Sequence, residues 1–266
     1  MNSEIVLLKL GGSLVTFKSK KAKADNKTIA RLAKEIAAAL KAKPMSLIIG
    51  HGGGSFPHFP AHKYSVHKGI TGKDSTLGFA ITQDSAAQLN RIIVAALLKE
   101  KVRAVSFPPS SWTLARKGEI ELAFTSQIRL ALEKGMVPVV YGDPALDMGQ
   151  GICILSTEKI LSYLALEFGA QRTIMATRVD MVFTGDPQKN KKVEPIPEIT
   201  SSNFREIQPL LSGANETDVT GGMSHKVGSL VRLSASGVKC EIAGGMIPGN
   251  IKNALLGKPH KSTSIC

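Results

Sequence analysis

The chain has 266 residues, of which 43% are hydrophobic and 5% aromatic, and its formal net charge is +13. This length and apolar content suffice for one large α/β domain or two small ones with a substantial buried core. No apolar run reaches the roughly 20 residues that a membrane-spanning helix needs, and the N-terminal residues lack the features of a signal peptide. The three cysteines (Cys153, Cys240 and Cys266) lie far apart, which argues against a disulfide framework or zinc ribbon and fits a reducing, cytoplasmic location.

The positive charge comes from 34 Lys and Arg against 21 Asp and Glu. Such a field attracts polyanions, among them nucleic acids, anionic lipids and phosphorylated small molecules. The lysines are dispersed apart from short clusters at 18–23 and 189–192, and no aromatic residues interleave with a basic stripe as a single-strand binder requires. We therefore expect most of this charge to be solvated surface and a minority of it to be functional.

Short apolar, β-branched runs alternate with longer segments of helical period along the whole chain. The predicted strands are 4–10, 45–50, 102–107, 136–143, 172–177 and 238–245. The predicted helices are 28–42, 76–100, 125–135, 156–170, 222–237 and 247–257. A hairpin is predicted over 114–123, with its turn at Lys117 and Gly118. This order predicts an α/β protein with a mostly parallel sheet and helices on both faces. The segment 178–220, rich in Lys, Pro, Ser and Asn, is the predicted boundary between two lobes.

Three glycine loops follow predicted strands or open predicted helices: KLGGS (9–13), HGGGS (51–55) and VTGGMSHK (219–226). The carboxyl ends of parallel strands share one edge of a sheet, where ligands bind. Glycines there let backbone N–H groups approach oxyanions, and a following helix N-terminus favours negative charge. Three such loops, two with a lysine in place, predict a site for two phosphate groups.

The common nucleotide and metal motifs are absent. No GxxxxGK[ST] occurs, because Gly72-Lys73 is followed by Asp74 and Gly257-Lys258 by Pro259. The 51–58 stretch is no GxGxxG, since it has no third glycine in place, and it is no GxSxG nucleophile elbow. No HExxH or Cys/His cluster marks a metal site, so no metal-ligating residue is predicted.

LLKLGGSLVTFK, IIGHGGGSFPH, PVVYGD and DVTGGMSHK, in this order, resemble the amino acid kinase superfamily. Within it, the arrangement is most similar to the isopentenyl phosphate kinases, over nearly the whole chain. The resemblance implies a single domain over 1–266, a three-layer αβα sandwich around an open, mostly parallel sheet. It implies an acceptor-binding N-terminal lobe (about 1–175), a nucleotide-binding C-terminal lobe (about 176–266) and a homodimer. It also implies that isopentenyl phosphate and ATP react to give isopentenyl diphosphate and ADP, a step of isoprenoid biosynthesis by an alternative mevalonate route.

Phosphoryl transfer asks a protein mainly for positioning and for positive charge around the moving group. A lysine inside an apolar strand is costly without a function, which favours a role for Lys9. The resemblance implies that Lys9 and Lys226 contact the ATP phosphates, that Lys18 contacts a further phosphate and that His58 holds the acceptor's phosphate. The alternatives are a snorkelling strand lysine, solvated helix or surface lysines and an ordinary loop histidine. His51 is expected to shape the loop instead.

The remaining predicted site residues are backbone donors and small polar side chains. For the acceptor they are Gly52, Gly53, His58, Asp143 and Thr157; for the nucleotide they are Lys9, Gly11, Gly12, Ser13, Gly53, Thr177, Gly222 and Lys226. Asp143 could orient a lysine or contact the acceptor, with a helix or turn cap as its alternative. Asp218 and Thr220 are expected to order the loop that presents Gly222. Mg²⁺ is expected to arrive with ATP, which needs few protein ligands.

Several positions depart from the family's commonest pattern. Pro57 replaces a glycine and removes one backbone N–H. LSTEK (155–159) stands where Ser-Gly-Asp-Asp is usual, so Glu158 is the candidate to order the two active-site lysines. Arg178 and Met181 replace Asp and Gly near the nucleotide.

Three alternatives remain. A fosfomycin kinase-like phosphonate kinase would have a small polar acceptor pocket. An apolar tunnel would instead favour an acceptor with an isoprenoid tail. Its candidate lining residues are Phe79, Ile81, Ile92, Ile93 and Trp112. For most of these residues, packing in the hydrophobic core is the alternative. His58 also argues against an acetylglutamate or glutamate kinase, because a histidine at this position suits an acceptor phosphate better than an acceptor carboxylate. A non-catalytic nucleotide or nucleic-acid binder would bind DNA or RNA in a salt-sensitive way. The kinase interpretation, by contrast, predicts no nucleic-acid partner and no membrane partner.

Overall fold

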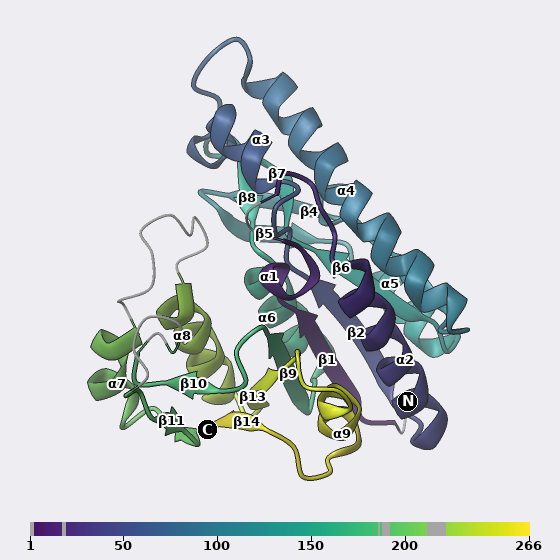
Figure 1. Cartoon of the computed structure of the whole chain (residues 1–266). Coiled ribbons are helices and arrows are strands. Elements are labelled where there is room, and N and C mark those ends of the chain that lie inside the picture. The colour runs from purple at the N-terminus through teal and green to yellow at the C-terminus, as the bar shows by residue number, and fades with distance from the viewer. Residues whose placement is uncertain (1–2, 18–19, 186, 188–191, 212–221) are drawn as a thin grey trace.

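The computed structural model describes residues 3–17, 20–185, 187, 192–211 and 222–266. An eight-stranded sheet crosses the molecule in the order β12-β14-β13-β9-β1-β2-β6-β3 (Figure 1). Its strands are β12 (Glu198–Ile199), β14 (Ser262–Ile265), β13 (Lys239–Gly244), β9 (Arg172–Thr177), β1 (Ile5–Leu10), β2 (Ser46–His51), β6 (Val137–Tyr141) and β3 (Ala104–Ser106). Only the β13–β14 pair is antiparallel among these neighbours. The prediction of a mostly parallel sheet is confirmed.

Alternate residues of the central strand β1 enter two different hydrophobic cores. Ile5 and Leu7 belong to one cluster, whereas Val6 and Leu8 belong to the other. Successive side chains of a strand point to opposite faces, so both faces of the sheet are buried. This is why the strand is apolar at every position except Lys9, and it gives the three-layer αβα sandwich that the family resemblance implied.

Different helices cover the two faces. One face is packed by residues of α5, α6 and α8, and the other by residues of α1, α2, α4 and α9. The helices are α1 (Gly12–Val15), α2 (Asn26–Ala42), α3 (His58–Lys63), α4 (Ser75–Lys99), α5 (Ser126–Glu133), α6 (Thr157–Phe168), α7 (Phe204–Leu211), α8 (Gly222–Ser234) and α9 (Asn250–Leu256). Local capping fixes two of their starts: Asp25 accepts a hydrogen bond from the Thr28 backbone N–H, and Ser156 accepts one from the Lys159 backbone N–H.

A smaller four-stranded sheet runs in the order β5-β4-β7-β8. It contains β5 (Glu119–Ala123), β4 (Thr113–Arg116), β7 (Asp143–Asp147) and β8 (Gly151–Leu155). The β4–β5 hairpin confirms the predicted turn at Lys117 and Gly118, both of which have positive φ. Asp147 accepts bonds from backbone N–H groups of that turn and of the β7–β8 turn, which lowers its pKa to about 2 against the opposing effect of burial.

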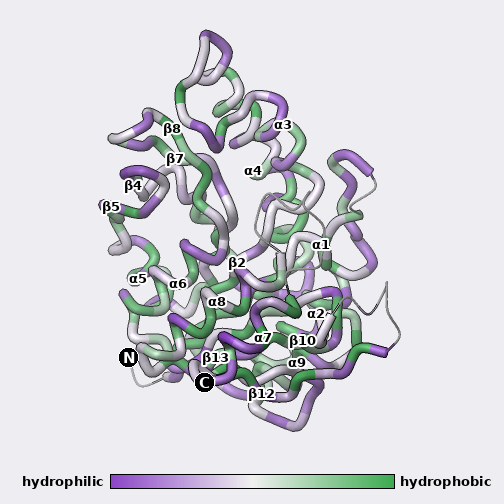
Figure 2. Tube along the Cα trace, turned by 90° about the vertical axis from the view of Figure 1, so that its left-hand side faces the viewer, coloured by the Kyte–Doolittle hydropathy of each residue, from purple (hydrophilic) through white to green (hydrophobic). Residues whose placement is uncertain are grey.

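Two short strands, β10 (Val182–Phe183) and β11 (Pro195–Ile196), pair separately. The connection from α3 to α4 projects beyond the sheet at one end of the molecule (Figure 1). Figure 2 shows hydrophilic and hydrophobic residues mixed along this projecting end. Within the described ranges, no helix is both long and apolar enough to cross a membrane.

Candidate active site

Lys9 is buried near the carboxyl end of the central strand, with 3% of its surface exposed. Its Nζ donates a hydrogen bond to Glu158 Oε1, and Glu158 is itself 7% exposed in the first turn of α6. Burial by itself would raise the pKa of Glu158, but the charge and hydrogen bond of Lys9, together with a backbone hydrogen bond and the charge of Lys226, hold it below its usual value. Glu158 therefore stays ionised, and the pair forms a buried ion pair.

Lys226 joins this pair from the other half of the chain. It lies in the second turn of α8, half-buried, and its charge also lowers the pKa of Glu158. One carboxylate is thus under the influence of two lysines that lie on different elements. The contact of Glu158 with Lys9 agrees with the prediction, whereas its ordering of Lys226 stays a prediction.

The first two glycine loops touch each other directly. A Cβ added to Gly12 would lie 2.6 Å from the backbone N of Gly54, and one added to Gly52 would lie 2.6 Å from the backbone N of Gly12. Gly52 N–H donates to Leu10 O at 2.9 Å, and Gly11 N–H donates to Ala176 O at 2.9 Å. The turns after β1 and β2 therefore form one continuous backbone surface, which no side chain could enter.

Pro57 closes the second loop. A Cβ on Gly53 would lie only 2.2 Å from Pro57 Cγ, so the proline ring packs against the loop's central glycine. Pro57 is also the residue before α3, whose first residue is His58. Pro57 has no backbone N–H to donate, but its ring supplies a contact between the loop and the helix. His58 is half-exposed, while Lys18 lies outside the described residues, as do Asp218 and Thr220.

His51 is structural, as predicted. It is fully buried, and burial lowers its pKa to about 4. Its Nδ1 lies 3.2 Å from Gly52 O and its Nε2 lies 3.2 Å from Asn90 Nδ2, while its ring stacks on Tyr141 with centroids 5.2 Å apart. A neutral imidazole satisfies both bonds, since one nitrogen donates and the other accepts. His51 thus fixes the start of the glycine loop.

Asp143 is the first residue of β7 and is 1% exposed. Its Oδ2 accepts a hydrogen bond from the Ser110 backbone N–H at 3.0 Å, in the 3-10 turn Pro109–Ser111, while its contact with the acceptor stays a prediction. Its Oδ1 is buried without a hydrogen-bond partner among the described residues. Burial raises its pKa to about 6, although hydrogen bonds from Ser110 act in the opposite direction.

The two predicted threonines are engaged with the backbone. Thr157 begins α6, and its Oγ1 donates to His51 O at 2.8 Å. Thr177 ends β9, and its Oγ1 donates to Val179 O at 2.7 Å. Both side chains hold the site's framework, and any contact of theirs with a ligand stays a prediction.

Ser13 and Gly222, two of the residues predicted to contact the nucleotide, lie in α1 and α8. Ser13 is half-buried in α1, and its carbonyl oxygen accepts a bond from Arg178 Nη1 at 3.4 Å. Gly222 opens α8 with φ +63°, a conformation that favours glycine. Among the described residues, no group of three or more His, Cys, Asp or Glu side chains is placed to hold a metal ion.

Trp112 and Ile93, two candidate tunnel residues, lie instead in the hydrophobic cores, and Ile92 packs against one of them. Sequence reasoning missed the role of Lys159, whose Nζ donates to Gly118 O at 2.6 Å and to Glu119 Oε1 at 2.5 Å. Lys159 ties the first turn of α6 to the β4–β5 hairpin. In the sequence, only its position beside Glu158 indicated that Lys159 lies near the candidate site.

A buried lysine–carboxylate pair beside glycine loops on a parallel sheet is an arrangement for binding and transferring phosphoryl groups. A model of the amino acid kinase family matches residues 4–244, and the chain belongs to this family.

The chain is 39% identical to the isopentenyl phosphate kinase of Methanothermobacter thermautotrophicus, over 98% of each chain. It is 34% identical to the isopentenyl phosphate kinase of Methanocaldococcus jannaschii, over 96% of each. A solved structure of an isopentenyl phosphate kinase superposes with a TM-score of 0.86 at 35% identity, covering 99% of this chain and 100% of the other. The amino acid kinase fold predicted from the motifs is confirmed.

Proposed function

We propose that this protein transfers the γ-phosphoryl group of ATP to isopentenyl phosphate, giving isopentenyl diphosphate and ADP. The observation that carries the proposal is the buried Lys9–Glu158 pair, with Lys226 close enough to influence the same carboxylate. The transferred group is an anion and develops no strong covalent bond to the protein, so fixed positive charge and positioning supply the catalysis. The similarity to isopentenyl phosphate kinases over almost the whole chain supports the choice of acceptor.

In this proposal, Lys9 and Lys226 neutralise charge on the transferred phosphoryl group, and Glu158 holds Lys9 in position. Lys18 adds a further phosphate contact. On the acceptor side, His58 donates a hydrogen bond to the phosphate of isopentenyl phosphate. The supporting residues are Gly52, Gly53, Asp143 and Thr157 for the acceptor, and Gly11, Gly12, Ser13, Gly53, Thr177 and Gly222 for the nucleotide.

The glycine loops pack backbone against backbone, because a side chain on Gly12 or Gly52 would collide with the other loop, and in this proposal their backbone N–H groups face the phosphates. The acceptor-binding residues belong to the N-terminal lobe (about 1–175) and Gly222 and Lys226 to the C-terminal lobe (about 176–266). Mg²⁺ would arrive with ATP and neutralise its phosphate charge. The chain's own lysines then hold the two phosphate groups in line.

The proposed assembly is a homodimer. The long helix α4 carries apolar side chains on more than its core face: Leu77 and Leu98 are each 54% exposed, while Leu89 and Leu97 are buried. These two leucines lie 21 positions apart, so the proposal of a dimer rests on the resemblance to the family. Light scattering after size exclusion tests this, and a monomeric mass at micromolar concentration would contradict it.

An ADP-release assay with Mg·ATP tests the function, with isopentenyl phosphate, dimethylallyl phosphate, fosfomycin and N-acetylglutamate as parallel acceptors. We expect turnover on the isoprenoid phosphates and its loss in His58→Ala. His62→Ala, an exposed histidine of the same helix, is the matched control. Turnover on fosfomycin alone would favour the phosphonate kinase. Absence of turnover on every acceptor, with salt-sensitive DNA or RNA binding, would favour the non-catalytic binder.

A further inference from the structure

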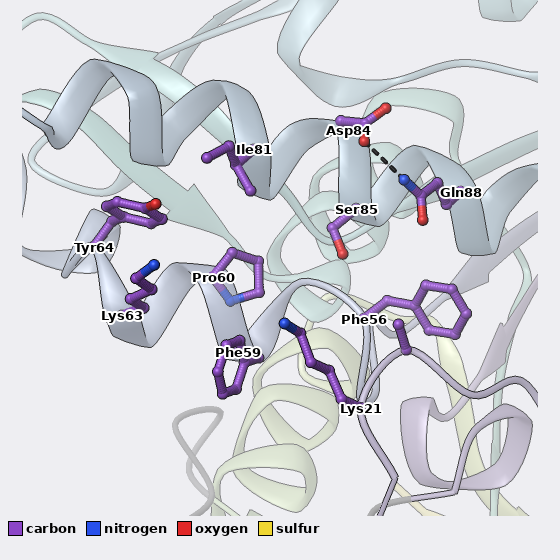
Figure 3. A pocket seen from close by; sticks show the side chains of 11 residues that line it. Lys21, Phe56, Phe59, Pro60, Lys63, Tyr64, Ile81, Asp84, Ser85 and Gln88 are labelled. Atoms are coloured by element: carbon purple, nitrogen blue, oxygen red, sulfur yellow. Dashed lines mark hydrogen bonds between the residues drawn. The ribbon is translucent and has the colours of Figure 1, made fainter.

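A hollow lies on one side of α3, and none of its lining residues is assigned to either phosphate group in the proposed function, although Ile81 was a candidate tunnel residue. Its volume is about 260 Å³, and its walls come from α3, the first half of α4 and the segment around Lys21 (Figure 3). Neither Lys9 nor Glu158 lines it, and neither does His58. The hollow is therefore separate from the candidate active site, although α3 connects the two.

The floor and sides of the hollow are largely apolar. Phe56, at 4% exposed, is one of the lining residues, as are Tyr64 directly after α3 and Ile81 of α4 (Figure 3). Phe59 is 53% exposed and Ile81 is 37% exposed, so apolar surface here meets water. Covering that surface with hydrocarbon is favourable, and pockets of this composition usually take a ligand with an apolar part.

Two ammonium groups stand over aromatic rings of the hollow. Lys21 Nζ lies 4.2 Å from the centroid of Phe59, and Lys63 Nζ lies 4.9 Å from the centroid of Tyr64. Each keeps donors that a second partner can use, since an ammonium has three N–H groups. The acid among the lining residues, Asp84, accepts a hydrogen bond from Gln88 Nε2 at 2.8 Å. The lining therefore has a net positive charge and a neutral apolar floor.

We propose that this hollow is a second ligand site, for an amphiphilic anion with a hydrocarbon tail and a phosphate head. The tail would lie against Phe59, Tyr64 and Ile81, and the head would lie between Lys21 and Lys63. Binding requires both halves of such a molecule, because the aromatic rings contact the hydrocarbon tail and the ammonium groups contact the charged head.

Occupancy of the hollow acts on the acceptor site through shared elements. His58 begins the helix that carries Phe59, Lys63 and their neighbours, and Lys21 belongs to the same segment as Lys18. A ligand that fixes α3 also fixes His58, which is proposed to contact the acceptor's phosphate. This consequence rests on the proposed function, whereas binding in the hollow does not.

Isothermal titration of the full chain with decyl phosphate, below its micelle concentration and without ATP, tests the binding. We expect one saturable site per chain that neither inorganic phosphate nor decanol fills. The double variant Lys21→Ala/Lys63→Ala should weaken binding at least about tenfold, the effect of losing charged hydrogen bonds. Ser85→Trp, which fills the hollow from α4, should weaken it similarly. Lys73→Ala, an exposed lysine outside the hollow, should bind as the parent does.

His58→Ala separates the hollow from the acceptor site. Retained binding in His58→Ala supports the proposal, while binding lost there but kept in Ser85→Trp overturns it. In kinase assays, decyl phosphate should lower kcat at saturating acceptor, and Ser85→Trp should turn over normally without this inhibition. Inhibition that the acceptor fully relieves would overturn the coupling. If no acceptor is turned over, the proposed function fails and the titration still decides the site.

Discussion

A Cβ atom on Gly52 would lie 2.6 Å from the backbone N of Gly12, although the two residues belong to loops 40 positions apart in the chain. Real Cβ atoms do not approach a backbone so closely, so the absence of a side chain at both positions is a requirement of the fold. The contact joins the turn after β1 to the turn after β2. It makes a single backbone surface from the loops that the proposal assigns to two different substrates.

Gly52→Ala should therefore separate the two loops. We expect a loss of about 1–3 kcal/mol in unfolding free energy, the usual cost of overpacking, and a loss of most kinase activity. Gly72→Ala is the matched control, because a Cβ there meets nothing within 4 Å. Urea unfolding and steady-state kinetics measure both effects. Equal behaviour of the two variants would contradict the tight contact.

Glu158 should matter through Lys9. Glu158→Gln leaves a buried ammonium without its counter-charge, which typically costs about 3–5 kcal/mol. We expect kcat to fall about a hundredfold, because a displaced lysine no longer meets the transferred group. Glu158→Asp keeps the charge and should retain more of both stability and kcat. If Glu158→Gln matched the parent in kcat, Glu158 would have no positioning role.

The sequence predicted the elements whose pattern is local and strong. The continuous apolar strand around Leu7 and the long α4 helix both appear close to their expected bounds. The strand Ser262–Ile265 was missed, because it is short and is defined by pairing with the distant β13. The six-residue helix from His58 to Lys63 was missed for a similar reason, since its sequence contains Pro60 and no helical period.

The site was predictable to the extent that motifs mark it. Lys9 and Glu158 are 149 positions apart, and residue type suggested their partnership, but only the fold brings them into contact. The orphaned Oδ1 of Asp143 has no counterpart in the sequence pattern. The burial of a side chain and the absence of a hydrogen-bond partner depend on all the elements packed around it. Neither can be predicted from the local sequence pattern alone.

His260 should make stability depend on pH near neutrality. Its Nε2 lies 2.7 Å from Glu241 Oε2, and this hydrogen bond raises its pKa above the ordinary value of 6.5. The folded state therefore holds the proton more tightly than the unfolded state. The stabilisation is fully present below pH 6.5 and is lost as the pH rises through the higher, folded value. Urea unfolding across this range should show the decline, and His260→Gln should remove it. His67→Gln, an exposed histidine, should leave it unchanged.

Asp143 should make the free energy of unfolding decline with rising pH in a second, more acidic range. Burial raises its pKa from 3.8 to about 6, so between these values the folded state binds a proton that the unfolded state has released. Stability therefore falls as the pH rises from 3.8 to about 6, by about 3 kcal/mol in total. Asp143→Asn should flatten this part of the profile, while Asp74→Asn, an exposed carboxylate, should preserve it. Steady-state kinetics on the same variant test its proposed acceptor contact: we expect a raised KM for the acceptor with a smaller change in kcat. A pH profile identical to that of the parent would show that Asp143 is not titrating in this range.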